Sequence, residues 1–90
     1  MKINKCIIES VRDIGIWFWD RTQGEITNSL VLSTGFDGIR LTGEANVDIV
    51  DNIIHQSNMH GIVCGDRSKS MIERNRVLQC KGQCTGREYT

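Results

Sequence analysis

The 90-residue sequence repeats every 23 residues, and this period constrains the fold more than any single motif does. A glycine followed by an isoleucine recurs at that interval, at Gly15-Ile16, Gly38-Ile39 and Gly61-Ile62. Two further apolar columns keep the same step, and they are Ile3, Ile26, Ile49 and Ile72, and Ile8, Val31, Ile54 and Val77. A fixed period of about 20–50 residues is the signature of stacked repeats, in which each unit buries its apolar face against its neighbours. The sequence therefore predicts a solenoid.

Within each repeat, apolar residues alternate with polar ones over short stretches, as at Val47 and Ile49 and again at Ile62 and Cys64. Such alternation is typical of strands, and no window shows the apolar spacing that a helix needs. Proline is absent and glycine occurs 9 times, which suits short strands joined by tight turns. We therefore predict an all-β fold, a right-handed single-stranded parallel β-helix of about four coils with three short strands per coil.

The repeat assigns each column a place in the predicted coil. We expect the Ile3 column, the Ile8 column and the Gly-Ile column to point inward from three separate sheets, with Phe18, Leu41 and Cys64 beside the last of these. A further column is expected to approach the core just before the Gly-Ile sheet, and it comprises Asp13, Phe36, Met59 and Gly82. Asn52 and Asn75 share one corner with Ser29 and Cys6 of the preceding coils. We expect asparagine there to adopt the left-handed bend and to bond the equivalent amide one coil away.

The chain is short enough for one domain, residues 1–90, with coils at approximately 3–25, 26–48, 49–71 and 72–90. About four turns spaced ~4.8 Å apart make a stack only ~19 Å long, open at both ends. Because solenoids normally carry caps, we expect a segment of a longer β-helix or a chain that self-associates end to end.

Composition excludes several classes of partner. Lysine plus arginine balances aspartate plus glutamate at 11 each, so no basic field is available for nucleic acid. No apolar run approaches the ~20 residues that span a bilayer. Residues 1–8 lack the apolar region of a secretory signal. We expect neither a nucleic-acid partner nor a membrane partner.

Four cysteines fall at four different positions of the repeat. Cys64 occupies the column of Phe18 and Leu41 and is expected in the core, and Cys6 lies at the asparagine corner. Cys80 and Cys84 could form a local disulfide or remain thiols. A zinc site that combines them with His60 is a weaker alternative, because its spacing is not a recognised motif. We expect no metal site and no cofactor.

The pattern Ile-x-x-Asn-x-[Ile/Val], followed seven residues later by Gly-Ile, resembles the parallel β-helix repeat of the pectin-lyase-like superfamily. That group includes pectate and pectin lyases, polygalacturonases, alginate epimerases, phage tailspikes and NosD-like carbohydrate-binding proteins, and its members are usually extracellular or periplasmic. The resemblance covers residues 3–80 and implies the fold, but it does not fix an activity. A leucine-rich repeat is the rival fold, since Val47, Ile49 and Asn52 also fit its core, but Gly24 and Ser70 interrupt that strand.

The resemblance implies that a sugar polymer would lie along the outer face of the Gly-Ile sheet. Outward positions there are Trp17, Arg40 and Val63 in one column, and Trp19, Thr42 and Gly65 in the next. Exposed tryptophans suit stacking on a pyranose ring, although a covering protein would satisfy them equally. We predict Trp17, Trp19 and Arg40 as the binding strip.

Catalytic candidates are weaker. Asp37 and His60 share a column directly before glycine, and an Asp–His pair suits acid/base work. Asp20 and Asp66 share another column, two coils apart with Gly43 between them, and Glu44 follows Gly43. These three carboxylates could instead be solvated turn residues. Polygalacturonases use clustered aspartates, and pectate lyases use calcium-binding aspartates with an arginine base. Neither arrangement maps residue by residue onto this chain.

Three functions follow from this pattern. We expect a β-helix repeat module that binds polysaccharide and is not catalytic on its own. The alternatives are a fragment of a polysaccharide lyase, hydrolase or epimerase, and a structural segment of a phage tail spike or surface adhesin.

Overall fold

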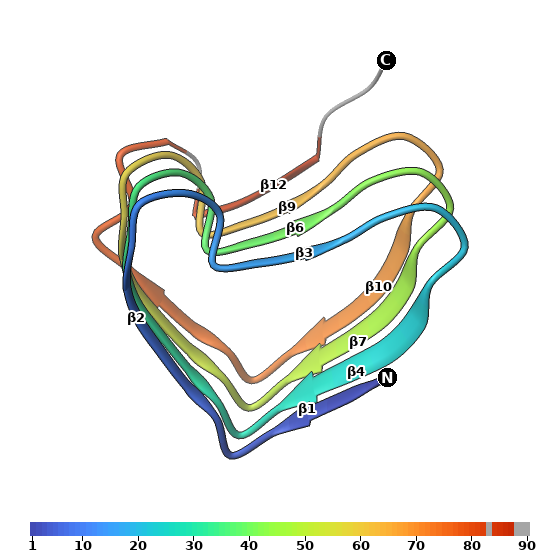
Figure 1. Ribbon diagram of the computed structural model, residues 1–90, viewed down its shortest axis with the longest axis horizontal. Coiled ribbons are helices and arrows are strands. Elements are labelled where there is room, and N and C mark those ends of the chain that lie inside the picture. The colour runs from blue at the N-terminus through green and yellow to red at the C-terminus, as the bar shows by residue number, and fades with distance from the viewer. Residues whose placement is uncertain (83, 88–90) are drawn as a thin grey trace.

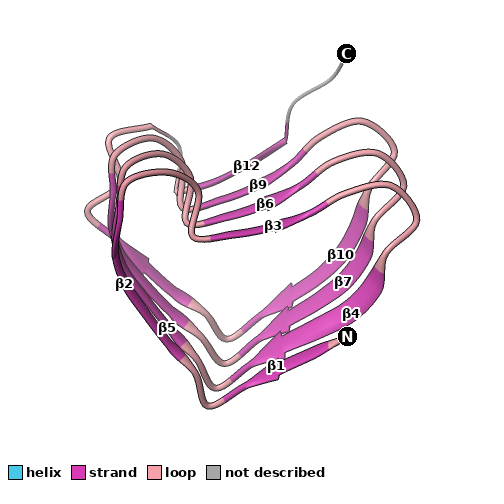
Figure 2. Cartoon of the chain, in the orientation of Figure 1, coloured by secondary structure: helices cyan, strands magenta, loops and turns pink. Residues whose placement is uncertain are grey.

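The computed structural model describes residues 1–82 and 84–87, which wind into a solenoid built of strands and turns (Figures 1 and 2). Sheet A contains β1 (Lys2–Asn4), β4 (Gln23–Thr27), β7 (Asn46–Val50) and β10 (Lys69–Glu73). Sheet B contains β2 (Ile7–Val11), β5 (Leu30–Thr34), β8 (Ile53–Ser57) and β11 (Arg76–Leu78). Sheet C contains β3 (Ile16–Phe18), β6 (Ile39–Leu41), β9 (Ile62–Cys64) and β12 (Thr85–Arg87).

All neighbouring strands are parallel, and each residue pairs with the residue 23 positions later, as Ile26 does with Ile49. The four strands of each sheet therefore stem from successive coils, and each coil supplies one strand to every sheet. This confirms the predicted all-β solenoid with three strands per coil and excludes the leucine-rich alternative. Among the described residues, no helix is long and apolar enough to cross a membrane.

The core fills the inside of the coil with stacked aliphatic side chains. The central members of the predicted columns are fully buried, namely Ile26, Ile49, Val31, Ile54, Ile39 and Ile62. Burial of each such side chain contributes about 1.5–3 kcal/mol. Ile3 and Ile8 in the first coil are only half-buried, and Ile72 in the last is exposed, because a coil covers them on one side only.

The Gly-Ile landmark has a steric cause. A Cβ added at Gly38 would lie 2.6 Å from Ile54 Cγ2 and 2.7 Å from the carbonyl oxygen of Gly61. The chain enters sheet C so close to the next coil that only glycine fits. The isoleucine that follows then points directly into the core.

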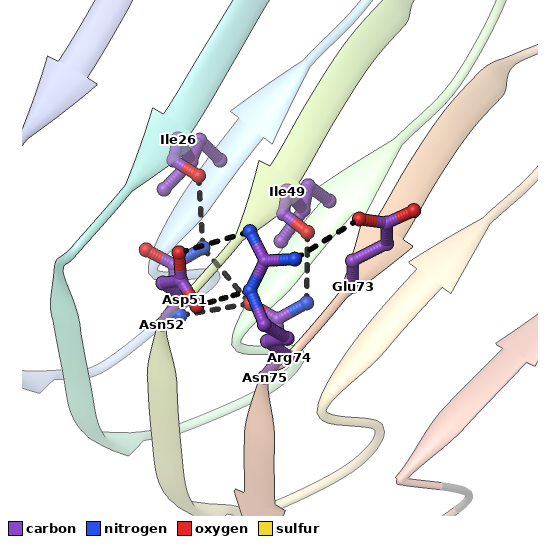
Figure 3. Close-up of polar contacts among 7 residues, drawn as sticks. All are labelled: Ile26, Ile49, Asp51, Asn52, Glu73, Arg74 and Asn75. Carbon is purple, nitrogen blue, oxygen red and sulfur yellow. Dashed lines mark hydrogen bonds and ion pairs between the residues drawn. The ribbon is translucent and has the colours of Figure 1, made fainter.

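The corner between sheets A and B is held by side-chain amides that bridge coils (Figure 3). Asn52 Nδ2 donates to the carbonyl oxygen of Ile26 at 2.8 Å and to Asn75 Oδ1 at 3.0 Å. The main-chain N–H of Asn52 also donates to Asn75 Oδ1, and that of Ser29 donates to Asn52 Oδ1, both at 2.9 Å. The predicted amide-to-amide contact is therefore confirmed.

The left-handed bend at this corner lies one residue earlier than predicted. Positive φ occurs at Lys5, Asn28, Asp51 and Arg74. The asparagines that follow the last two, Asn52 and Asn75, bond through their amides to main-chain carbonyls of Ile26 and Ile49. Asparagine is needed for its amide, and the exposed residue before it takes the strained conformation. Arg74 Nε donates to Asp51 Oδ1 at 2.8 Å, and this hydrogen bond lowers the pKa of Asp51 below its usual value.

A second prediction, that the Phe36 column approaches the core, is wrong. Phe36 is 50% exposed and Met59 is 44% exposed, and Asp13 and Gly82 are also exposed. The next column is the more buried one, with Asp37 at 4%. The loops before sheet C stack on one another through main-chain hydrogen bonds, such as that from the Phe36 N–H to the carbonyl of Asp13. The residues at the tips of these loops therefore point away from the core.

The structure gives the state and the surroundings of each cysteine. Cys80 and Cys84 form a disulfide with a Cα–Cα distance of 5.5 Å, so their thiols cannot join His60 in a zinc site. Cys64 is buried in the core as predicted, and Cys6 is an exposed thiol. In the described part of the chain, no group of three metal-ligating side chains comes together.

Candidate functional site

Two tryptophans stand on the outer face of sheet C, in the first coil. Trp17 lies between the buried residues Ile16 and Phe18 of β3, and Trp19 follows directly after the strand. Their side chains are 47% and 58% exposed. The ring centroids are 5.1 Å apart and the planes meet at 71°, an edge-to-face pair. The outward direction predicted from alternation is therefore confirmed.

Trp17 is fixed by the neighbouring coil. Its indole N–H donates to Thr42 Oγ1 at 2.9 Å, and the Arg40 guanidinium carbon lies 5.5 Å from the ring centroid. A guanidinium at that distance from an indole is a cation–π contact. One face of Trp17 is thus occupied, and the ring has a bonded edge, so Trp19 offers the freer aromatic surface.

Asp37 lies beneath this strip in the loop before β6. Its Oδ1 accepts the main-chain N–H of His60 at 3.1 Å, and its Oδ2 lies 3.6 Å from Arg40 Nη1. Both oxygens are engaged, and a buried carboxylate needs such partners. Asp37 therefore ties Arg40 to the loop of the next coil. Its contact with His60 runs through the main chain of that residue.

The five predicted site residues are thus linked to one another by contacts. A continuous series of contacts runs from His60 through Asp37 and Arg40 to Trp17, and the last member is Trp19. The arrangement offers a free aromatic ring beside a positioned guanidinium. The catalytic assignment of Asp37 and His60 stays a prediction, since Asp37 here positions an arginine.

The strip does not extend along the whole sheet. Val63 follows Arg40 in its outward column, yet it is buried. Gly65, which follows Thr42 in the neighbouring column, is buried too. The aromatic surface is therefore confined to the coil of β3, and the coil of β6 adds Arg40 to the strip. Sequence alternation gave the direction of these side chains correctly but not their exposure.

The carboxylates near the turn after sheet C have structural partners. Glu44 lies 3.3 Å from Arg21 and 4.0 Å from Arg67, and Asp66 Oδ2 accepts the main-chain N–H of Gly43 at 2.9 Å. Asp20 adopts positive φ at the equivalent turn position. These contacts favour turn residues over an acid/base cluster.

Sequence reasoning missed a groove at the end of the sheet B strands. Its volume is about 660 Å³, and three successive coils line it with equivalent positions, among them Ser33, Gln56 and Gln79. Ser33 Oγ and Gln56 Oε1 are 3.1 Å apart and hydrogen-bonded across neighbouring coils. The 23-residue spacing of these polar residues was the available signal.

Parallel strands, cross-coil register and a filled interior define a parallel β-solenoid. A family model described as a right-handed β-helix region matches residues 1–86, so the chain belongs to the right-handed β-helix family. No curated protein and no solved structure matches the sequence significantly.

Proposed function

We propose that this β-helix module binds polysaccharide on the outer face of sheet C, through Trp19, Trp17 and Arg40. The observation that carries the proposal is the exposed tryptophan pair, held beside an anchored arginine. Exposure of two large aromatic rings to water is unfavourable and does not stabilise the coil, so a binding role explains the rings better.

The contacts divide the work among the three residues. Trp19 is the most exposed of them and supplies a ring face for a pyranose. Trp17, bonded to Thr42 and covered by Arg40, supports Trp19 at a fixed angle. Arg40, placed beside Trp17 and Asp37, brings a guanidinium to the strip, a group that suits the hydroxyls or carboxylate of a sugar.

Affinity electrophoresis against neutral and uronic-acid polymers tests this proposal. We expect Trp19→Ala to weaken binding about tenfold, because loss of one stacking contact of about 1.4 kcal/mol corresponds to that factor. Phe36→Ala is the matched control, because Phe36 is a similarly exposed aromatic residue that lies in the loop before β6 and is not one of the three residues of the strip. Wild-type protein that migrates unretarded through every polymer would refute the proposal.

Arg40→Gln separates the role of charge from that of stacking. If Arg40 contacts a sugar carboxylate, this variant loses retention on uronic-acid polymers and keeps that on neutral ones. Equal losses on both would assign Arg40 only to holding Trp17.

A structural solenoid segment is the second candidate, favoured by the open ends of the coil. Ile72 of β10 is exposed although it stands in the inward column, and β1 pairs only with β4. Such ends suit continuation of the β-helix or end-to-end contact with another copy. Filaments in wild-type protein that vanish in Ile72→Lys support this role, and strict absence of filaments argues against it.

The enzyme alternative rests on Asp37 and His60 alone. It requires release of products from a uronic-acid polymer, with loss of that release in Asp37→Ala and His60→Ala. Retention on the polymer without product release leaves the binding role.

A further inference from the structure

The outer face of sheet B is largely aliphatic, in contrast to the outer face of sheet A. Two outward columns cross its four strands in register. The first runs Ile7, Leu30, Ile53 and Arg76, and the second runs Glu9, Leu32, His55 and Leu78. Five of these eight side chains are aliphatic, and Ile7 and Leu78 are 64% and 45% exposed.

Sheet A provides the internal comparison. Its corresponding outward columns run Lys2, Glu25, Asp48 and Met71, and Asn4, Thr27, Val50 and Glu73. Most of those residues are polar or charged, as expected for a sheet face in water. The aliphatic character of sheet B is therefore a property of that face, and a contiguous aliphatic surface suits contact with another protein surface.

We propose that the outer face of sheet B binds the same face of a second copy, about a two-fold axis parallel to the strands. This rotation reverses the order of coils, so Leu30 of one copy lies opposite Ile53 of the other, twice per dimer. An isologous contact of this kind closes on itself.

The charges at the two ends of the face select this arrangement. Glu9 lies in the first coil and Arg76 in the last, both are exposed, and neither forms an ion pair within the described residues. The reversed arrangement places Glu9 of each copy diagonally across from Arg76 of the other, one outward column away. A two-fold axis along the solenoid would instead bring Glu9 near Glu9 and Arg76 near Arg76, which electrostatics disfavours.

The size of the face sets the expected strength. Four strands ~4.8 Å apart and five residues of ~3.3 Å give a patch of roughly 300 Å² per copy, well below the ~800 Å² of a standard interface. The dimer is therefore expected to be weak and to form only at high protein concentration.

Sedimentation velocity between about 10 µM and 1 mM measures this equilibrium. Wild type shifts from monomer to dimer, and Leu30→Glu and Ile53→Lys each stay monomeric throughout. Val50→Lys is the matched control, because Val50 is an outward aliphatic residue of sheet A, and this variant dimerises like wild type. Circular dichroism confirms that each variant is folded. Ile7→Arg, at the most exposed position of the face, gives the same loss if Leu30→Glu does not fold.

Mixing the two monomeric variants tests the direction of packing. In the reversed arrangement, the new carboxylate at position 30 faces the new ammonium at position 53, while the other Leu30–Ile53 contact is intact. The mixture therefore forms a heterodimer. A mixture that remains monomeric, a wild type that is monomeric at 1 mM, or association that survives Leu30→Glu would each overturn the proposal. Association lost in Ile72→Lys instead would place the contact at the ends of the coil.

Discussion

At the scale of single residues, Asn52 does the most to hold the coil together. Its side chain satisfies the N–H of Ser29 in one coil, the carbonyl of Ile26, and Oδ1 of Asn75 in the next coil. Ser29 performs part of the same bridging role in its own coil, because its Oγ accepts the N–H of Cys6 at 3.2 Å. A hydroxyl therefore continues the series of accepted N–H groups at a position where the sequence has no asparagine.

Asn52→Ala should lower the free energy of unfolding by about 2–4 kcal/mol, because a buried N–H and a buried carbonyl lose their partners. Urea denaturation followed by circular dichroism measures the change. Asn46→Ala, at an exposed asparagine of β7, should stay within about 0.5 kcal/mol of wild type. Equal effects of the two substitutions would show that the corner amide is not a source of stability.

At the scale of the elements, the entry into each sheet C strand limits the packing of coils. Gly38 lies against the carbonyl of Gly61, whereas a Cβ at Gly65 would meet its nearest neighbour, the carbonyl of Leu41, at an ordinary 3.6 Å. Glycine before a sheet C strand, as at Gly38, and glycine after such a strand, as at Gly65, are thus present for different reasons. Only the first is required by close approach.

Gly38→Ala should destabilise the protein by about 1–3 kcal/mol through overpacking against Ile54 and the next coil. Gly65→Ala should stay within about 1 kcal/mol of wild type, since its φ is not positive and space is available. Thermal unfolding of the two variants provides the comparison. A larger loss in Gly65→Ala would contradict this account of the Gly-Ile landmark.

The candidate site shows how much the alternation of inward and outward residues along a strand can predict. Alternation with Ile16 and Phe18 correctly predicted that Trp17 faces outward, and the shared column correctly placed Asp37 beside the loop of His60. It did not predict that Asp37 would hold Arg40, because that contact depends on how deeply the loop sits. Alternation did not reveal the aliphatic outer face of sheet B, because the aliphatic residues of that face are next in sequence to the residues of the core columns.

At the scale of the whole molecule, each coil is stabilised by its neighbours, so the middle of the stack is the most stable part. β4 and β7 have hydrogen-bonded strands on both sides, whereas β1 and β10 each have one. In such a one-dimensional stack, stability is a sum of repeat and neighbour terms.

Amide hydrogen exchange should therefore show a gradient along the coil. Amides of β7 should exchange slowest, near the rate set by global unfolding, and those of β1 fastest, because end coils open without disturbing the centre. Mass spectrometry of exchanged peptides at low protein concentration gives this profile. Uniform protection from β1 to β10 would show that the ends are covered by another molecule or that the stack unfolds as one unit.

The sequence by itself determined the period of 23 residues, the three strands per coil and the inward columns. These follow from local alternation and from steric limits, which repeat identically in every coil. Only the tertiary structure decided where the left-handed residue of the corner lies, that Phe36 and Met59 face water, and that Asp37 anchors Arg40. Each of these depends on contacts between residues from different coils, and those contacts exist only once the chain has wound.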